Sequence, residues 1–407
     1  MPSSAQEEAG CGRTRGPRWN PALLALAGVL ICRGALAQAT GEVFDALKFI
    51  EYDLYDYSPE EQAAWEASRY AQQAIRLDLG SVTLNELFSI EEAQVNLRPT
   101  PWLGFHLDVE DYRTREQEVT RLLTDFSFPV LPWLELLATA SPGLRKDEGA
   151  LGVGAMAASA DRKQYAVLRL LDDAPFFNGR NPEGGVRDSA VWRVLAELRG
   201  SRGGLSAWLR ADLGTKSDVR FTMPAQVQAN QRNDVAFHLR WEPTGWARRE
   251  GGFGIRGILR LLDNDRSELE VRNQLRRTLA YARIYATLPL SDLFRVYSVL
   301  LLASDQGRGF DAGLPFTFSR WDVGIRGGTT VDLGLFRLDA GYALARSQRE
   351  IQGDPTWSGL SPVGYGDKVY LSAQWRPRKN IYLKFLISHQ VFTGDFGGLN
   401  GSLGAIF

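Results

Sequence analysis

The chain is poor in the side chains on which metal sites and nucleophilic catalysis most often depend. It has two cysteines, Cys11 and Cys32, and three histidines among 407 residues. Both cysteines fall in an N-terminal segment that we expect to be removed, so the mature protein is predicted to have no disulfide, Cys–metal site or Cys nucleophile. No metal-ligand cluster, phosphate-binding glycine loop or nucleophile elbow is present. The sequence therefore predicts neither a metal nor another cofactor.

Long apolar runs are also missing from residues 38–407, so no transmembrane helix is expected there. The formal net charge is −1, from 47 Lys and Arg against 48 Asp and Glu, which gives no reason to expect nucleic acid as a partner. Charged residues make up 23 % of the chain. That fraction suits a soluble protein, and it equally suits a membrane β-barrel, whose polar lumen dilutes the apolar outer face.

The N-terminus has the pattern of an export signal. Arginines at three positions between 13 and 18 precede an apolar run over 21–31, which is too short to span a membrane. Ala35-Leu36-Ala37 supplies small residues at the spacing that a signal peptidase requires. We predict a cleaved signal peptide over residues 1–37. The alternative is attachment of a lipid at Cys32. It is disfavoured because the bulky Ile31 stands where a small residue is expected.

From residue 72 onward the sequence alternates between apolar and polar residues in segments of about 9–13 residues. We predict an all-β fold, a transmembrane antiparallel up-and-down β-barrel of about eighteen strands over 72–407, with sixteen as the alternative because the first strand is the least secure. The predicted strands are 72–80, 87–97, 102–111, 118–128, 132–141, 149–159, 163–172, 188–199, 204–214, 234–243, 252–262, 275–288, 293–303, 319–331, 335–346, 367–376, 380–391 and 399–407.

Short turns alternate with long polar connections along this series of strands. The long connections are predicted at 173–187, 215–232, 263–273, 304–318 and 347–366. Short periplasmic turns and longer outer loops are typical of bacterial outer-membrane barrels.

Aromatic residues lie close to the short turns, at the height where they would form an interfacial girdle. They are Trp102, Trp133, Trp246, Phe294, Phe336 and Tyr382. A periplasmic or secreted all-β protein with one wet sheet face would show the same alternation and is the alternative. Together with the export signal, these aromatic residues favour a membrane barrel whose outer face contacts lipid.

The C-terminal segment alternates up to a terminal aromatic residue. Leu403, Ala405 and Phe407 fall on one face, and we interpret them as an assembly signal. This ending, the signal peptide and the strand rhythm resemble porin-like Gram-negative outer-membrane β-barrels. The resemblance implies residence in the cell outer membrane, contact with outer-membrane lipid, and insertion by the barrel-assembly machinery.

Residues 38–71 do not have the strand pattern. Ser58, Pro59 and Glu61 form an N-terminal capping pattern, which predicts a helix from Pro59 to about Ala71. This pre-barrel segment is predicted either to lie in the lumen as a plug or to sit at the periplasmic mouth.

Charged residues on the polar face of the strands are predicted to line the pore, because charge on the lipid face costs about 2–4 kcal/mol per residue at the midplane. The acidic set lies on the early strands and consists of Glu92, Asp108, Glu110, Asp125 and Glu135. The basic set lies on the middle strands and consists of Arg169, Arg193, Arg199, Arg210, Arg240, Arg256, Arg260, Arg277, Arg283 and Arg295. An acidic sector facing a basic sector would set up a field across the pore. Alternatively, these charges pair and fill the lumen.

Catalytic centres of known enzymatic barrels are not matched by the sequence. Ser388 and His389 are adjacent and so face opposite sides of a strand. His106 and Asp108 share a face and could form a base and its orienting acid, but a wetted lumen network explains them as well. We therefore expect a protein that is not an enzyme.

An arginine-rich barrel of about eighteen strands also resembles the export barrels of exopolysaccharide pathways, including alginate-type exporters. That resemblance implies an outer-membrane conduit for a secreted polysaccharide. This chain lacks the helical-repeat domain of several such exporters, so a separate periplasmic polysaccharide-export protein would have to deliver the polymer. The alternatives are a general or anion-preferring diffusion porin for small anionic solutes, and a non-transport barrel in adhesion or a motility complex.

Overall fold

The computed structural model describes Tyr70 and most residues from Gln73 to Ile406. The chain divides into two units after Ala37, and all described residues belong to the second, Gln38–Phe407. The described residues are 70, 73–79, 89–113, 118–141, 149–173, 185–187, 191–215, 217–222, 225–242, 252–268, 271–311, 313–353, 364–378, 381–392, 394 and 396–406. The predicted signal peptide lies outside them. So does the predicted helix apart from Tyr70, which lies in a turn.

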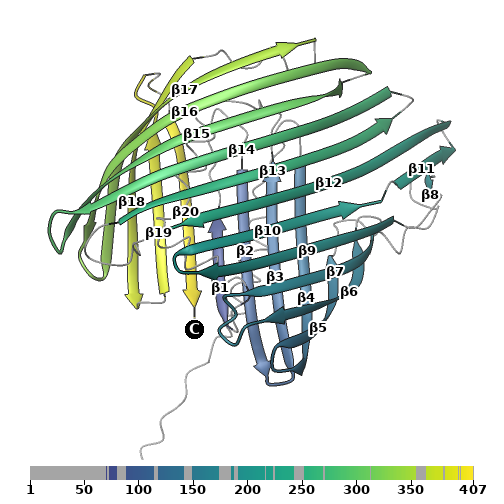
Figure 1. Ribbon diagram of the computed structural model, residues 1–407, viewed down its shortest axis with the longest axis horizontal. Helices are drawn as coiled ribbons and strands as arrows, with labels where there is room; N and C mark the ends of the chain where they lie inside the picture. The colour runs from purple at the N-terminus through teal and green to yellow at the C-terminus, as the bar shows by residue number, and fades with distance from the viewer. Residues whose placement is uncertain are drawn as a thin grey trace, which may run out of the picture. The chain divides into compact units, whose positions relative to one another are not determined.

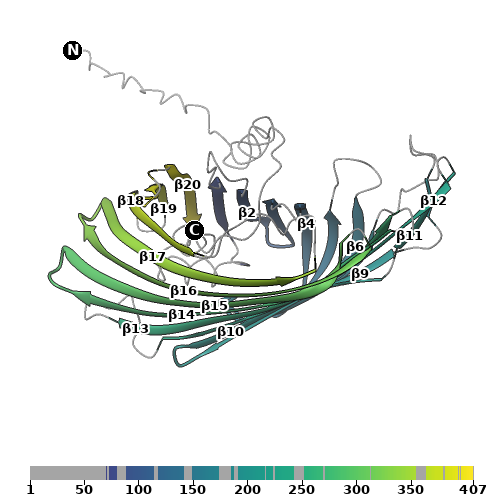
Figure 2. The ribbon, with the colours of Figure 1, turned by 90° about the horizontal axis from the view of Figure 1, so that it is seen from above.

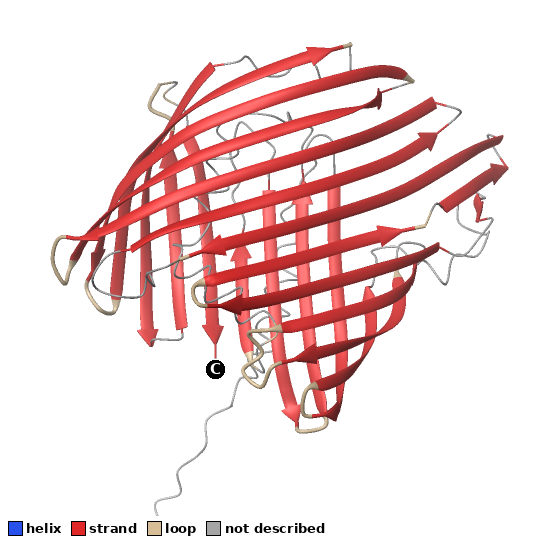
Figure 3. Ribbon diagram, in the orientation of Figure 1, coloured by secondary structure: helices blue, strands red, loops and turns tan. Residues whose placement is uncertain are grey.

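The described part of the chain is all β (Figure 3). In this part no helix is long and apolar enough to cross a membrane. The strands are β1 (Ala74–Leu79), β2 (Ser89–Thr100), β3 (Leu103–Arg113), β4 (Glu118–Leu131), β5 (Leu134–Ser141), β6 (Ala150–Ala158), β7 (Tyr165–Asp173), β8 (Gly185–Arg187), β9 (Val191–Arg202), β10 (Leu205–Gly214), β11 (Ser217–Thr222), β12 (Ala225–Trp241), β13 (Gly252–Glu268), β14 (Val271–Pro289), β15 (Phe294–Asp311), β16 (Leu314–Asp332), β17 (Phe336–Gln352), β18 (Gly364–Arg378), β19 (Ile381–His389) and β20 (Phe396–Ile406).

The strands form one closed antiparallel ring. Each ring strand pairs with the next along the chain, except that β7 pairs with β9 and β10 with β12, past the short β8 and β11. Setting β8 and β11 aside leaves 18 strands in the ring. The first strand closes it, because β1 pairs with β2 on one side and with β20 on the other. In Figure 1 the long strands β12 to β17 cross in front of the steeper β2 to β4, and Figure 2 shows these two sets on opposite sides of the ring.

The prediction of eighteen strands is confirmed, and the pairing of β1 on both edges excludes sixteen. Three of the predicted long loops are wrong. In 215–232, β11 covers Ser217–Thr222 and β12 begins at Ala225. Strand β13 continues to Glu268 and β14 begins at Val271, so 263–273 is mostly strand. Likewise β15 continues to Asp311 and β16 begins at Leu314, within the predicted loop 304–318. Polar and glycine-rich residues still form the hydrogen-bonded ladder there, because pairing uses the backbone alone.

Side chains alternate between an apolar outer face and a more polar inner face. On β16 the outward residues Trp321, Val323 and Ile325 are more than half exposed, whereas Arg320 and Asp322, which alternate with them, are buried. Four of the predicted girdle aromatics, Trp102, Trp133, Phe294 and Phe336, are exposed beside the short turns. Trp246 lies outside the described residues, and Tyr382 is half-buried. An apolar outer face with aromatic edges is what a barrel in lipid requires.

The turn between β9 and β10 shows how the chain reverses at the short-turn end. Gly203 and Gly204 form it, with φ angles of 57° and 82°. Positive φ at both central residues matches the twist of the flanking strands, and glycine adopts it without strain.

Replacing an outward residue of β16 tests the assignment of the outer face to lipid. We expect Ile325→Arg to lower the free energy of unfolding in phospholipid vesicles by about 2–4 kcal/mol, because the charge would face hydrocarbon. Thr317→Arg is the control, since Thr317 is exposed on the same face of the same strand beyond its apolar stretch. Denaturant titration measures both variants. Equal losses would contradict a lipid-facing outer surface.

Candidate functional site

The candidate site is the inner wall, formed by every second residue of the ring strands. On β7, for example, Tyr165, Arg169 and Leu171 are buried on the inner side, while Leu168 and Leu170 are exposed on the outer side. The inner wall therefore combines ionic, aromatic and apolar side chains.

Four of the arginines predicted to line the pore form short ion pairs with carboxylates of other strands. The nitrogen–oxygen pairs are Arg169–Asp125 at 2.5 Å, Arg193–Asp212 at 2.7 Å, Arg260–Asp234 at 2.5 Å and Arg277–Asp305 at 2.7 Å. Asp212, Asp234 and Asp305 were missed by the sequence reasoning, although each alternates with apolar residues on its own strand. On these strands the inner wall therefore carries both acidic and basic side chains, which the sequence prediction had placed in separate sectors.

Three further predicted arginines lie side by side across neighbouring strands. Arg240 on β12 is opposite Arg256 on β13, which is in turn opposite Arg283 on β14. All three are buried, and Arg240 Nε lies 3.4 Å from a carboxylate oxygen of Glu242. The Tyr285 hydroxyl donates a hydrogen bond to the same carboxylate. Like charges placed directly opposite one another repel, so this row is a locally basic part of the wall.

The other predicted wall residues also lie on ring strands. Arg199, Asp108 and Glu135 are buried, and Arg210 and Arg295 are partly buried. Glu92 is on β2 and Glu110 is on β3, but their side chains lie outside the described part of the structure. That these residues line a water-filled pore stays a prediction.

The predicted assembly residues lie on β20. Leu403 is exposed and is opposite Leu77 of β1 and Leu383 of β19, and Ala405 is partly buried. Phe407 lies outside the described residues, so its role stays a prediction.

A cluster at the short-turn end was missed by the sequence reasoning. Arg98 and Arg162 both form ion pairs with Glu135. Burial lowers the pKa of the Arg162 guanidinium, and the charge of Arg98 lowers it further, whereas Glu135 opposes the shift. Arg162 follows Asp161 in the β6–β7 turn, where sequence alone indicated only a turn.

Tyrosine rings lie across glycines on the inner wall between β15 and β18. Tyr297 is opposite Gly328 and Tyr370 is opposite Gly341. A Cβ atom at Gly328 would lie 2.5 Å from the Tyr297 hydroxyl oxygen, and one at Gly341 would lie 2.2 Å from that of Tyr370. Arg326 donates from Nε to the Tyr370 hydroxyl at 2.8 Å and from Nη2 to that of Tyr297 at 3.3 Å. Glycine is required here because only it leaves room for the rings.

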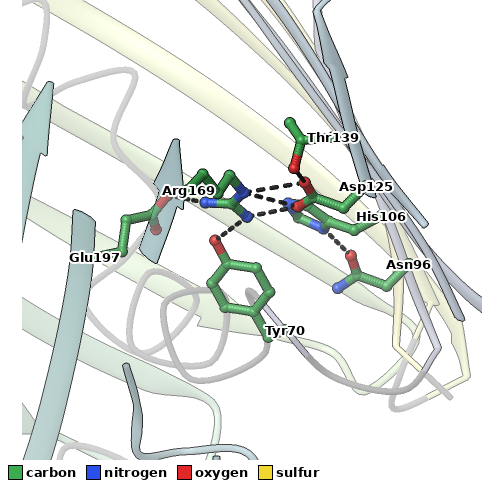
Figure 4. Close-up of polar contacts among 7 residues, drawn as sticks. All are labelled: Tyr70, Asn96, His106, Asp125, Thr139, Arg169 and Glu197. Atoms are coloured by element: carbon green, nitrogen blue, oxygen red, sulfur yellow. Dashed lines mark hydrogen bonds and ion pairs between the residues drawn. The ribbon is translucent and has the colours of Figure 1, made fainter. Parts of the chain in front are cut away.

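A second buried polar cluster surrounds Tyr70, which precedes β1 in the chain. Figure 4 shows it, with side chains from β2, β3, β4, β5, β7 and β9. Its members are Tyr70, Asn96, His106, Asp125, Thr139, Arg169 and Glu197. Arg169 binds Asp125 through both Nε and Nη2, and its Nη1 lies 3.6 Å from Glu197. A buried guanidinium with two carboxylates and a phenol is a closed ionic network.

The three histidines occupy different environments. His106 Nδ1 is hydrogen-bonded to the side-chain oxygen of Asn96, and its backbone is opposite Asp125. His238 packs against Trp208, with ring centroids 4.4 Å apart. His389 is exposed on the outer face while its neighbour Ser388 is buried.

These features define the class of the protein. A closed antiparallel ring of 18 strands with an apolar outer face and a charged inner wall is a porin-like outer-membrane β-barrel. No protein-family model matches the chain, and no curated protein matches it.

Solved structures of this fold class show weak similarity to the chain. The outer membrane channel DcaP of Acinetobacter baumannii is 12% identical over 82% of this chain and 96% of its own, with a TM-score of 0.33. OccK2 of Pseudomonas aeruginosa is 12% identical over 81% and 95%, with a TM-score of 0.32. OmpT of Vibrio cholerae, an outer membrane protein, is 9% identical over 82% and 94%, with a TM-score of 0.34. At these values no role is carried over, and the fold assignment rests on the strand pairing.

The prediction that the chain is not an enzyme is corrected here. It was drawn from the scarcity of histidine and cysteine and from the lack of a dyad within one strand. OmpT of Vibrio cholerae is among the neighbours beside channels and porins, and a barrel fold by itself does not decide whether a chain is catalytic. The structure also gives His106 a side-chain partner from another strand, which a search within one strand could not find. The exclusion is therefore wrong, and enzyme status is not established.

Removing one charge from the ionic network tests how strongly it holds the wall together. We expect Asp125→Asn to lower the free energy of unfolding by about 3–5 kcal/mol, because it breaks a buried ion pair and leaves the charge of Arg169 poorly compensated. Asp263→Asn is the matched control, since its pair with Arg276 is exposed and should contribute less than about 1 kcal/mol. Denaturant unfolding in detergent micelles measures both. A small effect of Asp125→Asn would contradict a closed network.

Proposed function

We propose that this barrel is an outer-membrane transport channel and that its substrate is an exported polysaccharide. The observation that carries the proposal is the inner wall of an 18-strand ring, which bears arginines, carboxylates and tyrosines. Rings of 16 to 18 strands are wide enough to leave an aqueous channel. Polar groups on the wall favour a hydrated substrate over an apolar one.

The mixed charges support a polymer as the substrate. Hydroxyl groups of a sugar chain can exchange hydrogen bonds with arginines, carboxylates and phenols along the whole wall. Because ion pairs such as Arg193–Asp212 and Arg277–Asp305 largely neutralise one another, an extended chain would meet many weak contacts without one deep binding site. Such a wall allows a polymer to slide.

The arginine row on β12, β13 and β14 favours a second candidate, an anion-preferring diffusion porin. Arg240, Arg256 and Arg283 lie side by side, and their potential would draw small anions into a channel with low-dielectric walls. Both candidates involve the same proposed path for solute.

Export and assembly are part of the same proposal. A cleaved signal peptide over 1–37 would deliver the chain to the periplasm, and the barrel-assembly machinery would insert it. For a polysaccharide substrate, a separate periplasmic protein would hand over the polymer.

Neutralising the arginine row separates the two candidates. We expect the triple variant Arg240→Gln, Arg256→Gln and Arg283→Gln to lose anion preference in planar-bilayer recordings, because the removed charges attract anions. In the unmodified protein this preference should weaken as salt screens the charges. An export barrel should also release less polysaccharide from cells when the row is changed, whereas a diffusion porin should leave release unaltered.

Arg276→Gln is the control, because Arg276 is exposed on the outer side of β14. It should alter neither ion preference nor polysaccharide release. A cation-preferring channel would contradict the role given to the arginine row. If the unmodified protein conducts no ions in planar bilayers and its loss leaves polysaccharide release from cells unchanged, the transport function is refuted.

A further inference from the structure

The outer face of β17 carries a positive charge where its apolar stretch ends. Arg346 is exposed, and it lies opposite Val323 of β16 and Tyr365 of β18. Both neighbours are more than half exposed on the outer side. Because residues opposite one another in antiparallel strands share a face, Arg346 also points outward. It therefore differs from the arginines of the candidate site, which lie on the inner wall.

Strand length places Arg346 at a boundary of the membrane. It lies ten residues beyond Phe336, the exposed aromatic residue at the short-turn end of β17. At about 3.3 Å per residue and a tilt of about 40°, this separation is about 25 Å along the membrane normal, which matches the apolar band of an outer-membrane barrel. On β16 the exposed Trp321 ends the apolar outer stretch in the same way, and the polar Ser319 and Thr317 follow it.

The side of the membrane follows from the short turns. Short turns are periplasmic in barrels of this class, and Arg346 is at the opposite end of the apolar band from the short turn before Phe336. Its guanidinium is therefore expected among the headgroups of the outer leaflet.

An aromatic ring holds the guanidinium of Arg346 from one side. Its Cζ atom lies 5.5 Å from the centroid of the Tyr365 ring. Within the described part of the structure, Arg346 forms no ion pair with a carboxylate. A ring face attracts the planar cation and leaves its N–H groups available to an anion.

The outward carboxylate diagonal to Arg346 is already bound by other donors. Asp367 of β18 lies opposite Leu344, the outward residue before Arg346 on β17. Its Oδ2 accepts a hydrogen bond from the Tyr342 hydroxyl at 2.8 Å, and its Oδ1 accepts one from the backbone N–H of Phe392 at 2.9 Å. Asp367 is 1% exposed. Arg346 thus faces the membrane boundary without a carboxylate bound to it.

We propose that Arg346 and Tyr365 form a docking site for the phosphate group of an outer-leaflet lipid. Anionic headgroups attract basic side chains that lie near the membrane surface, and the planar fork of arginine matches the oxygens of a phosphate. The exposed rings of Tyr365 and Trp321 suit the boundary between headgroups and acyl chains. The occupant is a lipid because the site is on the lipid-facing side of the ring. The proposal is independent of transport through the interior.

Lipid A, a phosphorylated glycolipid, is the probe for this site. Native mass spectrometry of the full mature protein in detergent measures its dissociation constant. We expect Arg346→Gln to bind lipid A about tenfold more weakly, the size expected when a hydrogen bond to a charged group is lost. Arg346→Lys keeps the charge without the fork and should fall between. Dephosphorylated lipid A should bind weakly, and equally, to the unmodified protein and to Arg346→Gln.

Arg276→Gln is the matched control. Arg276 is also exposed on the outer side, but its Nε lies 3.3 Å from a carboxylate oxygen of Asp263, so its charge is already compensated. This variant should bind lipid A like the unmodified protein. Tyr365→Phe keeps the ring and should retain binding, whereas Tyr365→Ala should weaken it. Heat-modifiable migration in gels verifies that each variant is a folded barrel.

Three outcomes would overturn the lipid site. The first is unchanged affinity for lipid A in folded Arg346→Gln. The second is equal weakening in Arg346→Gln and Arg276→Gln, which would show a response to general surface charge. The third is competition by inorganic phosphate at the same concentrations as lipid A, which would identify a site for the free anion. Weakening confined to the Arg346 and Tyr365→Ala variants, with inorganic phosphate a poor competitor, supports the docking of a lipid phosphate.

Discussion

Backbone hydrogen bonding in lipid is the constraint on which the rest of this structure depends. A strand with an unpaired edge in hydrocarbon would leave donors and acceptors unsatisfied at a cost of several kcal/mol each. The ring satisfies this constraint because β20 returns to β1, where Leu403 is opposite Leu77. Once the ring is closed, alternation assigns each side chain to lipid or to the interior. The charged and aromatic inner wall follows from that closure.

Inside the ring, the pairing of charges between strands determines which parts of the inner wall are neutral and which are basic. Arg193, Arg260 and Arg277 each have an aspartate on a neighbouring strand, so their charges are largely compensated where they lie. Arg256 has an arginine opposite it on each side, and Arg240 in that row pairs with Glu242. The two arrangements give the proposed channel both a neutral polar surface and a local basic row.

The region around Tyr70 connects a residue that precedes β1 to the inner wall. This region contains the buried Arg169, whose charge is balanced by Asp125 and Glu197, and the same arginine donates a hydrogen bond to the Tyr70 hydroxyl. The ionic network of the wall thereby also binds Tyr70. Sequence reasoning left residues 38–71 as either a plug or a periplasmic element, and within this range the structure describes Tyr70, whose side chain is buried against the inner wall.

Sequence by itself determined the all-β class, the number of ring strands and the face of most wall residues, because alternation is a local property with a period of two residues. It did not reveal where β13 to β16 end, since strands continue through polar residues wherever a neighbour supplies hydrogen bonds. It also missed Asn96 beside His106, the glycines beneath Tyr297 and Tyr370, and the contacts of Tyr70 with the inner wall. Those contacts join residues far apart in the chain, and only strand register and ring closure in the tertiary structure decide which of them meet.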